Sequence, residues 1–265
     1  TTFFLIDNFR YDQWRVIQPV LHSLFEVEKE DFYCSILPTA TQYARNAIFA
    51  GLMPAAIDKI MPDLWLNDNE HGGKNQHEED FLRRQMQSQG KSYKLFFDKI
   101  VKTDSGKRLI ENIDKVHNAD FSVIVYNFLD ILSHARTETQ IIRDLAEDEA
   151  AFRSLTRSWF EHSDLLELMR LLAERGHTII ITSDHGTIQV DNPVRVQGDR
   201  ATSSNLRYKT GRNLGFNQKE VFAITKPELA HLPKSNITST YIFAYNRDFF
   251  VYPNNTNQFV RYYNN

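Results

Sequence analysis

This chain of 265 residues has one cysteine, no long apolar run and a small net charge. Its one cysteine, Cys34, excludes an intramolecular disulfide framework and suits a reducing compartment. No stretch approaches the roughly eighteen apolar residues of a membrane span, and the first residues lack the basic leader of a signal sequence. The formal net charge of -3 gives no overall attraction to nucleic acid. We therefore expect a cytoplasmic protein that does not enter the membrane and that binds any anionic substrate through local cations or metal ions.

The chain does contain the material of a full hydrophobic core. Hydrophobic residues make up 42% and charged residues 25%, as in ordinary globular proteins. The length suits one large α/β domain or two modest ones. We expect a single domain over residues 1–265, and because the sequence begins inside a strand-like run we expect it to be a fragment.

Short apolar runs alternate with amphipathic stretches, which is typical of an α/β sheet covered by helices. The expected strands occupy residues 2–6, 31–37, 121–128, 177–182, 221–225 and 240–245. The expected helices occupy residues 13–25, 42–50 and 138–173, the last stretch as two helices. Residues 55–107 are polar and mostly helical, and we expect them to form an insertion or cap. Residues 191–217 are rich in Asn, Gly, Arg and Thr, which indicates a long functional loop.

Three aspartates follow apolar runs directly. Asp7 follows TFFLI, Asp130 follows FSVIVYNFL, and Asp184 follows HTIIITS. Ligands of open α/β sheets bind beyond the carboxyl ends of the strands, so these side chains are expected at one edge. Three carboxylates there would repel one another unless cations compensated their charge. A metal site is the simplest explanation.

Two histidines accompany these aspartates. His134 follows Asp130 by four residues, a spacing that puts both on one face of a helix, and His185 is adjacent to Asp184 on an expected turn. Mixed carboxylate and imidazole ligands favour zinc, with manganese or iron as substitutes. Each pair alone is also typical of a helix cap or a surface histidine. Their joint placement behind apolar strands indicates metal binding.

The candidate nucleophile is Thr41. It lies at the expected start of a helix, where backbone N–H groups and the helix dipole favour a phosphate. A nearby metal ion could activate its hydroxyl group. On local sequence alone, a simple helix N-cap is the better interpretation of Thr41 or Thr39, and the metal-ligand pattern reverses that judgement.

The motifs LIDNFRYDQW, PTATQYARNAIFAGLMP, D-x-x-x-H and SDHG, in this order, resemble the alkaline phosphatase superfamily. More narrowly, the chain resembles the PglZ domain, and it is most similar to the effector half of PorX-type response regulators. NPVRVQGDRATSSNLRYKTGRN after SDHG adds to that similarity. The resemblance implies a three-layer α/β/α sandwich with a mostly helical insertion or cap.

The resemblance also implies two zinc sites. Asp7, Asp184 and His185 would hold one ion next to Thr41, while Asp130 and His134 would supply two ligands of the other. The implied reaction is in-line attack on phosphorus through a phospho-threonine, which water hydrolyses. Asn46, one turn into the helix, would donate a hydrogen bond to a phosphate oxygen, and Asn8 is a weaker candidate.

The chain departs from the family pattern at its end. The second metal of the family takes a further histidine from a late His-Gly-Gly motif, which this sequence does not reach before Asn265. His71-Gly72-Gly73 has the right letters but falls in the polar insertion. We therefore expect that the chain is truncated and that the Asp130–His134 site is weak or empty.

A basic patch follows the SDHG motif and supplies the candidate substrate-binding residues. These are Arg200, Arg207, Tyr208, Lys209 and Arg212. The cations are suited to the phosphates of a nucleotide or oligonucleotide, with Tyr208 stacking on a base. The same composition is typical of a solvated loop.

Taken together, the residues and the resemblance predict a zinc-dependent phosphodiesterase acting on nucleotides or oligonucleotides. The PorX-like similarity implies the output domain of a two-component response regulator, with a receiver domain upstream, a homodimer, and secretion-system or sigma-factor partners. The alternative is a catalytically weak PglZ module that binds nucleotides or protein partners for regulation.

Overall fold

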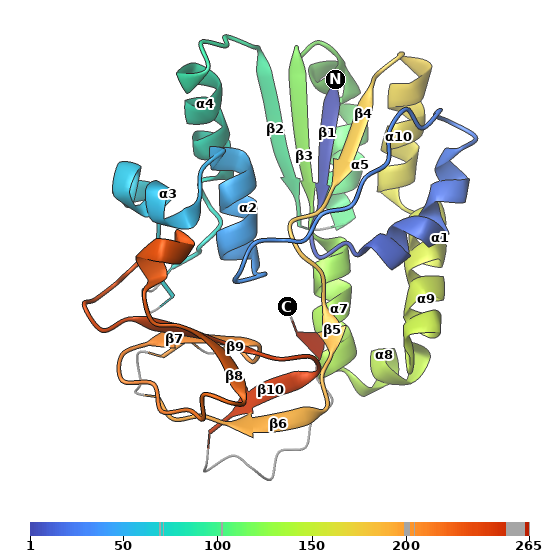
Figure 1. Ribbon diagram of the computed structural model, residues 1–265. Coiled ribbons are helices and arrows are strands. Elements are labelled where there is room, and N and C mark those ends of the chain that lie inside the picture. Colours follow the sequence, from blue (N-terminus) through green and yellow to red (C-terminus); the bar gives the residue numbers. More distant parts are fainter. Residues whose placement is uncertain are drawn as a thin grey trace. The chain divides into compact units, whose positions relative to one another are not determined.

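Figure 1 shows the computed structural model, which describes residues 1–68, 70, 72–101, 103–198, 202–203, 205–252 and 263–264. The chain divides into two compact units that alternate along the sequence. Unit 1 consists of Thr1–Ser35 and Gln89–Gly186, and unit 2 consists of Ile36–Ser88 and Thr187–Asn265. The expectation of one domain over the whole chain stays a prediction.

Unit 1 is built on a four-stranded parallel sheet with the strand order β2-β3-β1-β4. The strands are β1 (Thr2–Ile6), β2 (Leu95–Ile100), β3 (Phe121–Tyr126) and β4 (Ile179–Thr182). The central strands are largely apolar because both of their faces are buried, as Phe4 and Leu5 show on alternate sides of β1. In register, Phe4 lies between Ile124 and Ile181.

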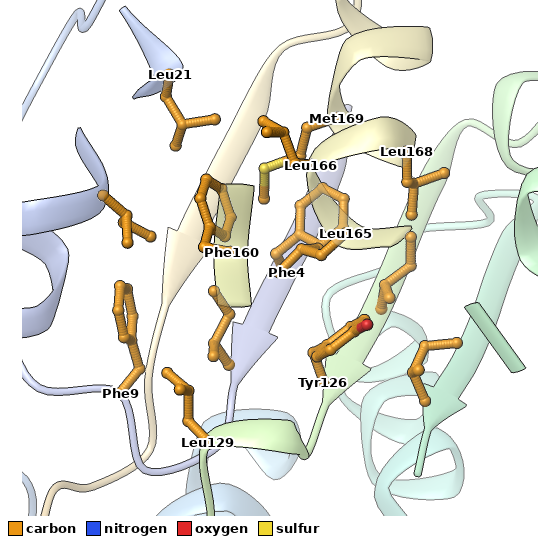
Figure 2. Close-up of a cluster of buried hydrophobic side chains, with 14 of the residues drawn as sticks. Phe4, Phe9, Leu21, Tyr126, Leu129, Phe160, Leu165, Leu166, Leu168 and Met169 are labelled. Carbon is orange, nitrogen blue, oxygen red and sulfur yellow. The ribbon is translucent and has the colours of Figure 1, made fainter. Parts of the chain in front are cut away.

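Helices of unit 1 contribute side chains to its core. They are α1 (Tyr11–Leu21), α5 (Thr103–Glu111), α6 (Ile113–His117), α7 (Phe128–Glu138), α8 (Gln140–Leu145), α9 (Glu149–Glu161) and α10 (Asp164–Glu174). Figure 2 shows the resulting core, where Phe4 and Tyr126 of the sheet meet Phe160 of α9 and Leu165 and Met169 of α10. Burying each such side chain contributes about 1.5–3 kcal/mol, which makes this layer the main support of the sheet.

Side-chain caps divide the helical stretch that was predicted over residues 138–173. The Asp148 carboxylate accepts a hydrogen bond from the Ala151 N–H (2.7 Å) at the start of α9, and the Ser163 hydroxyl accepts one from the Leu166 N–H (3.2 Å) at the start of α10. Such caps contribute about 1 kcal/mol each. The stretch therefore forms α8, α9 and α10 in succession.

Unit 2 combines short helices with a small antiparallel sheet. Its helices are α2 (Thr41–Ala50), α3 (Pro54–Ile60), η1 (Pro62–Leu64), α4 (Glu78–Ser88) and η2 (Pro227–Ala230). Its strands are β5 (Ile188–Gln189), β6 (Asn192–Arg195), β7 (Tyr208–Gly211), β8 (Val221–Ile224), β9 (Thr240–Ala244), β10 (Asp248–Val251) and β11 (Tyr263–Asn264). Strands β7, β9 and β8 form the antiparallel sheet, β6 pairs with β10, and β5 pairs with β11.

The α/β prediction is confirmed, with a parallel central sheet flanked by helices, but three local predictions are wrong. Strand β2 lies inside the predicted helical insertion and pairs with β3. Residues 31–37 form no strand, and Phe32 is 81% exposed there. The predicted loop over residues 191–217 contains β6 and β7. Among the described residues, no helix is long and apolar enough to cross a membrane.

Candidate metal centre

The ligand candidates of unit 1 come from three strand ends. Asp7 follows β1, Asp130 lies in the first turn of α7 just after β3, and His185 follows β4. Because the three strands are parallel neighbours, their carboxyl ends meet at one edge of the sheet. The N–H of Asp7 donates to the carbonyl oxygen of Tyr126 (2.9 Å), which continues the ladder to this edge.

The structure brings Asp7, Asp130 and His185 together. One ligand atom from each lies within 4.8 Å of the other two. Nε2 of His185 is 3.5 Å from Oδ1 of Asp7, and both side chains are almost completely buried, whereas Asp130 is partly exposed. The sequence places Asp130 with a second ion rather than with Asp7 and His185, and that division between two ions stays a prediction. The group could hold a metal ion.

Asp184 and His134 lie next to this group. Oδ2 of Asp184 is 3.9 Å from Nε2 of His185, and the Asp184 side chain is fully buried. Nε2 of His134 is 3.5 Å from Oδ2 of Asp130, and the His134 side chain is 61% exposed. The pair on α7 therefore forms as the D-x-x-x-H spacing predicts, with the histidine facing solvent.

Asn8 connects the carboxylates. Its N–H donates to Oδ1 of Asp184 (3.2 Å), and its side-chain amide donates to Oδ1 of Asp130 (3.2 Å). Asn8 is buried and has a φ of 59°, in the left-handed region that asparagine tolerates better than most residues. Sequence reasoning considered Asn8 only for contact with a phosphate. The order LIDN gives no sign of this bridging role, because it depends on the positive φ.

The turn that carries Asp184 and His185 is fixed by hydroxyl groups. Oγ of Ser183 accepts a hydrogen bond from the Phe9 N–H (2.8 Å) and donates to the His185 carbonyl (2.8 Å). Oγ of Ser35 donates to the Asp184 carbonyl (2.6 Å), and the Tyr33 hydroxyl donates to the Ser183 carbonyl. These bonds hold the adjacent Asp184 and His185 in an irregular turn, where both can face the same point.

The surroundings of His185 suit a metal ligand. Its Nδ1 is 3.4 Å from the Gly186 carbonyl oxygen, so a proton on Nδ1 leaves the lone pair of Nε2 directed at the carboxylates. The His185 N–H donates to Oδ1 of Asp184 (3.0 Å). Two carboxylates beside His185 concentrate negative charge, which a bound cation would neutralise.

Comparison with known proteins identifies the family. The family model described as the BREX system PglZ alkaline phosphatase-like domain matches residues 1–262. The chain belongs to the PglZ family. A search of curated proteins found no match. The group of Asp7, Asp130 and His185 is thus the candidate metal site of an alkaline phosphatase-like PglZ domain.

The two predicted catalytic residues of this PglZ domain lie on α2 in unit 2. Thr41 is the first helical residue, and the N-cap is Ala40, which supplies no side-chain hydrogen bond. Thr41 is therefore not the N-cap that the alternative interpretation required. Asn46 is buried, and its amide donates to the Lys74 carbonyl (3.2 Å).

The predicted substrate-binding residues are spread through unit 2 of the PglZ domain. Arg207 donates to the Tyr245 and Asp248 carbonyls, and burial lowers its pKa. Tyr208 is buried. Arg212 is exposed, and Arg200 lies outside the described residues.

Lys209 is the most deeply enclosed of these cations. It is 2% exposed, and its Nζ donates to the Ser203 carbonyl (2.9 Å). Burial lowers its pKa to about 8. As the side chain lies here, its ammonium group supports the interior of unit 2, which the basic composition of the segment did not indicate.

Proposed function

We propose that this PglZ domain is a zinc-dependent phosphodiesterase that acts on nucleotide or oligonucleotide phosphodiesters. The observation that carries the proposal is the convergence of Asp7, Asp130 and His185 within an alkaline phosphatase-like domain. The group lies at the carboxyl edge of a parallel sheet, which is where α/β enzymes bind their ligands.

The donor set fits zinc. Catalytic zinc sites combine three protein ligands from imidazole and carboxylate groups with one open position. Asp7, Asp130 and His185 would supply such a set, with Asp184 beside them, and Asp130 with His134 would hold a second ion. When bound, the metal supplies Lewis acidity that stabilises negative charge on phosphoryl oxygens. Asn8 keeps the carboxylates in place through its two hydrogen bonds.

Thr41 is the proposed nucleophile. Its hydroxyl oxygen forms a bond to phosphorus as the bond to the leaving alkoxide breaks, and the proton lost from Thr41 is balanced by the proton that this alkoxide takes up. Water then attacks the same phosphorus, the bond to Thr41 breaks, and one proton of the water returns to the Thr41 oxygen as a phosphate monoester is released. The start of α2 supports this role, because the backbone N–H groups and the helix dipole at a helix N-terminus attract a phosphate.

Asn46 and the cations would bind the rest of the substrate. One amide proton of Asn46 goes to the Lys74 carbonyl, which leaves the second for a phosphate oxygen. Arg212 is the exposed cation among the described candidates and is proposed to contact an outer phosphate, with Arg200 and Arg207 as further contacts. Lys209 and Tyr208 would act by supporting the strand that carries them.

The cellular role follows from the resemblance of the sequence motifs to PorX-type proteins. We propose that the domain is the cytoplasmic output of a two-component response regulator of the type IX secretion system. Phosphorylation of an upstream receiver domain would then control it, through a homodimer and secretion-system or sigma-factor partners.

Hydrolysis of bis(p-nitrophenyl) phosphate tests the proposed chemistry. Thr41→Ala is expected to lower kcat by at least about a thousandfold, because the nucleophile is lost. Thr39→Ala removes a neighbouring threonine outside the helix and should retain activity. Asp7→Asn and treatment with a chelator should each abolish turnover, and zinc should restore it only to the chelated wild-type protein. Equal rates for wild-type protein and Thr41→Ala would remove Thr41 from the mechanism and favour a binding module.

A further inference from the structure

Unit 2 contains a polar cavity of about 260 Å³, and of its lining residues only Arg212 has a role in the proposed chemistry. Its lining includes Tyr43 of α2, Asp68, Arg212 and Tyr241 of β9. The volume lies just below the usual range for drug-sized ligands, so it suits a small group such as one nucleobase. Every lining residue belongs to unit 2, which gives the cavity a fixed geometry within one compact body.

Asp68 is held firmly at this cavity. The Tyr43 hydroxyl donates to its Oδ2, and the Tyr208 hydroxyl donates to its Oδ1 (3.0 Å). Tyr43 and Tyr208 are themselves packed edge to face, with ring centroids 5.9 Å apart. A carboxylate has about four lone-pair positions, so each oxygen of Asp68 can accept one more hydrogen bond.

The tyrosine protons at the cavity are directed into the protein. The Tyr43 proton goes to Asp68, and the Tyr241 hydroxyl donates to the Pro233 carbonyl (3.0 Å). The hydroxyl oxygens of Tyr43 and Tyr241 lie 3.3 Å apart, and both rings are almost fully buried. Asp68 therefore presents hydrogen-bond acceptors at the cavity, and a ligand that binds it must bring donors.

The charge of Arg212 narrows the choice. A guanidinium group on the same cavity disfavours a cationic donor such as an amine and favours a ligand that also carries an anion. Among nucleobases, guanine presents two adjacent N–H donors, N1–H and the N2 amino group, which match both oxygens of a carboxylate. Adenine and cytosine place one donor beside an acceptor, and uracil places one donor between two acceptors.

We propose that this cavity binds the guanine base of a nucleotide, with N1–H and N2–H donating to Asp68 and the phosphate facing Arg212. The inference extends the proposed nucleotide phosphodiesterase by naming a base, and in that respect it rests on the proposed function. Binding itself requires neither Thr41 nor the metal centre.

Isothermal titration with chelator-treated protein tests the cavity without turnover. GMP is expected to bind at least tenfold more tightly than AMP, CMP or UMP, and ribose 5-phosphate should bind no better than those three. Asp68→Asn keeps the shape of the side chain but replaces one acceptor oxygen by a donor, so it should reduce GMP affinity at least tenfold. Arg212→Gln should weaken GMP more than guanosine, and Arg195→Gln, at an exposed arginine of β6, should change neither.

The affinities of the four nucleotides and ribose 5-phosphate for wild-type protein are enough to identify the preferred base, even if Asp68→Asn fails to fold. Equal affinity for GMP and ribose 5-phosphate, tighter binding of another nucleotide, or an absence of binding would each overturn the assignment. A guanine preference that survives both Asp68→Asn and Arg212→Gln would place the base elsewhere. Because hydrolysis of bis(p-nitrophenyl) phosphate involves no base, its outcome is independent of these titrations.

Discussion

At the scale of single residues, Asn8 determines how the carboxylates of unit 1 are arranged. It donates to Asp184 through its backbone and to Asp130 through its side chain, while adopting a positive φ. The backbone conformation and the side-chain hydrogen bond can be separated by mutation, because glycine accepts the same φ but has no side-chain amide. Metal-site mutations of such supporting partners typically cost 10–100-fold in affinity or activity.

We therefore predict that Asn8→Gly folds with nearly unchanged stability but binds zinc about 10–100-fold more weakly. Asn8→Ala should lose a similar amount of zinc affinity and also about 1 kcal/mol of stability, because alanine tolerates the left-handed backbone less well than asparagine does. Competition with a chromophoric chelator measures the affinity, and urea unfolding of metal-free protein measures the stability. Wild-type zinc affinity in Asn8→Gly would show that zinc binding does not need the hydrogen bond from the Asn8 side chain to Asp130.

The lowered pKa of Lys209 predicts the direction in which the free energy of unfolding changes with pH. Burial lowers its folded-state pKa from 10.5 to about 8, whereas the unfolded chain keeps the ordinary value. Between those values the unfolded state binds more protons than the folded state, so the stability contributed by this position rises with pH. Below about pH 8 both states are protonated, and the contribution is at its least favourable and constant.

The free energy of unfolding of wild-type protein relative to Lys209→Met should accordingly increase from about pH 8 to about pH 10.5. Urea unfolding at several pH values measures it. Lys219→Met, which removes an exposed lysine of the same unit, is the matched comparison and should show no such trend. A relative stability that stays flat through this window would mean that Lys209 is not destabilised by burial.

The residue scale also shows what the sequence could predict of the site. Asp7, Asp130 and His185 were predictable because each follows an apolar strand, and strand ends of a parallel sheet meet. Their grouping was not, since the sequence gives their order but no distances. Asp68 was missed entirely, because its importance comes from tyrosines far away along the chain, such as Tyr208.

At the scale of elements, the end of α2 depends on a glycine. Gly51 has a φ of 62°, and a Cβ there would lie 2.3 Å from the amide nitrogen of Gln85 on α4. Gly90, at the end of the α4 segment, has a φ of 66° and open space around it. Both positions thus require a positive φ, but only a side chain at Gly51 would meet Gln85.

Gly90→Ala is predicted to destabilise the protein by about 1–2 kcal/mol through backbone strain alone. Gly51→Ala should cost more, because Gln85 must also move away from the packed α2–α4 contact. The free energies of unfolding from urea titrations give both values. Adding Gln85→Ala to Gly51→Ala should bring the cost close to that of Gly90→Ala, and equal costs for the two single variants would argue against the contact.

Sequence patterns predicted best the elements that are fully buried or that end at a local signal. Strand β1 and helix α2 were found within a residue of their observed bounds, because one is an uninterrupted apolar run and the other ends at Gly51. Strand β2 was missed because an edge strand is only half-buried and its sequence, LFFDKI, includes charges. Residues 31–37 have strand-forming side chains, but they lack a pairing partner among the described strands.

At the scale of the whole molecule, metal binding and folding are linked. A ligand that binds only the folded state stabilises it by about 2.7 kcal/mol at a hundred times its Kd. We predict that zinc raises the urea midpoint of chelator-treated protein and that Asp7→Asn abolishes the increase. Magnesium should stabilise less, since it prefers oxygen ligands in octahedral geometry. Asp31→Asn removes an exposed carboxylate and should respond like wild-type protein, whereas an equal zinc effect in Asp7→Asn would locate the ion elsewhere.

The alternation of the two units along the chain also sets an order of assembly during synthesis. Residues 1–186 contain all of unit 1, including Asp7, Asp130 and His185, and only the first part of unit 2. A ribosome that has delivered these residues has therefore made every strand of the parallel sheet and the candidate ligands, while β7 and β9 have not yet been made. At about 5–20 residues per second, several seconds separate the two stages. The candidate metal ligands are thus all made before the strands that line the cavity around Asp68.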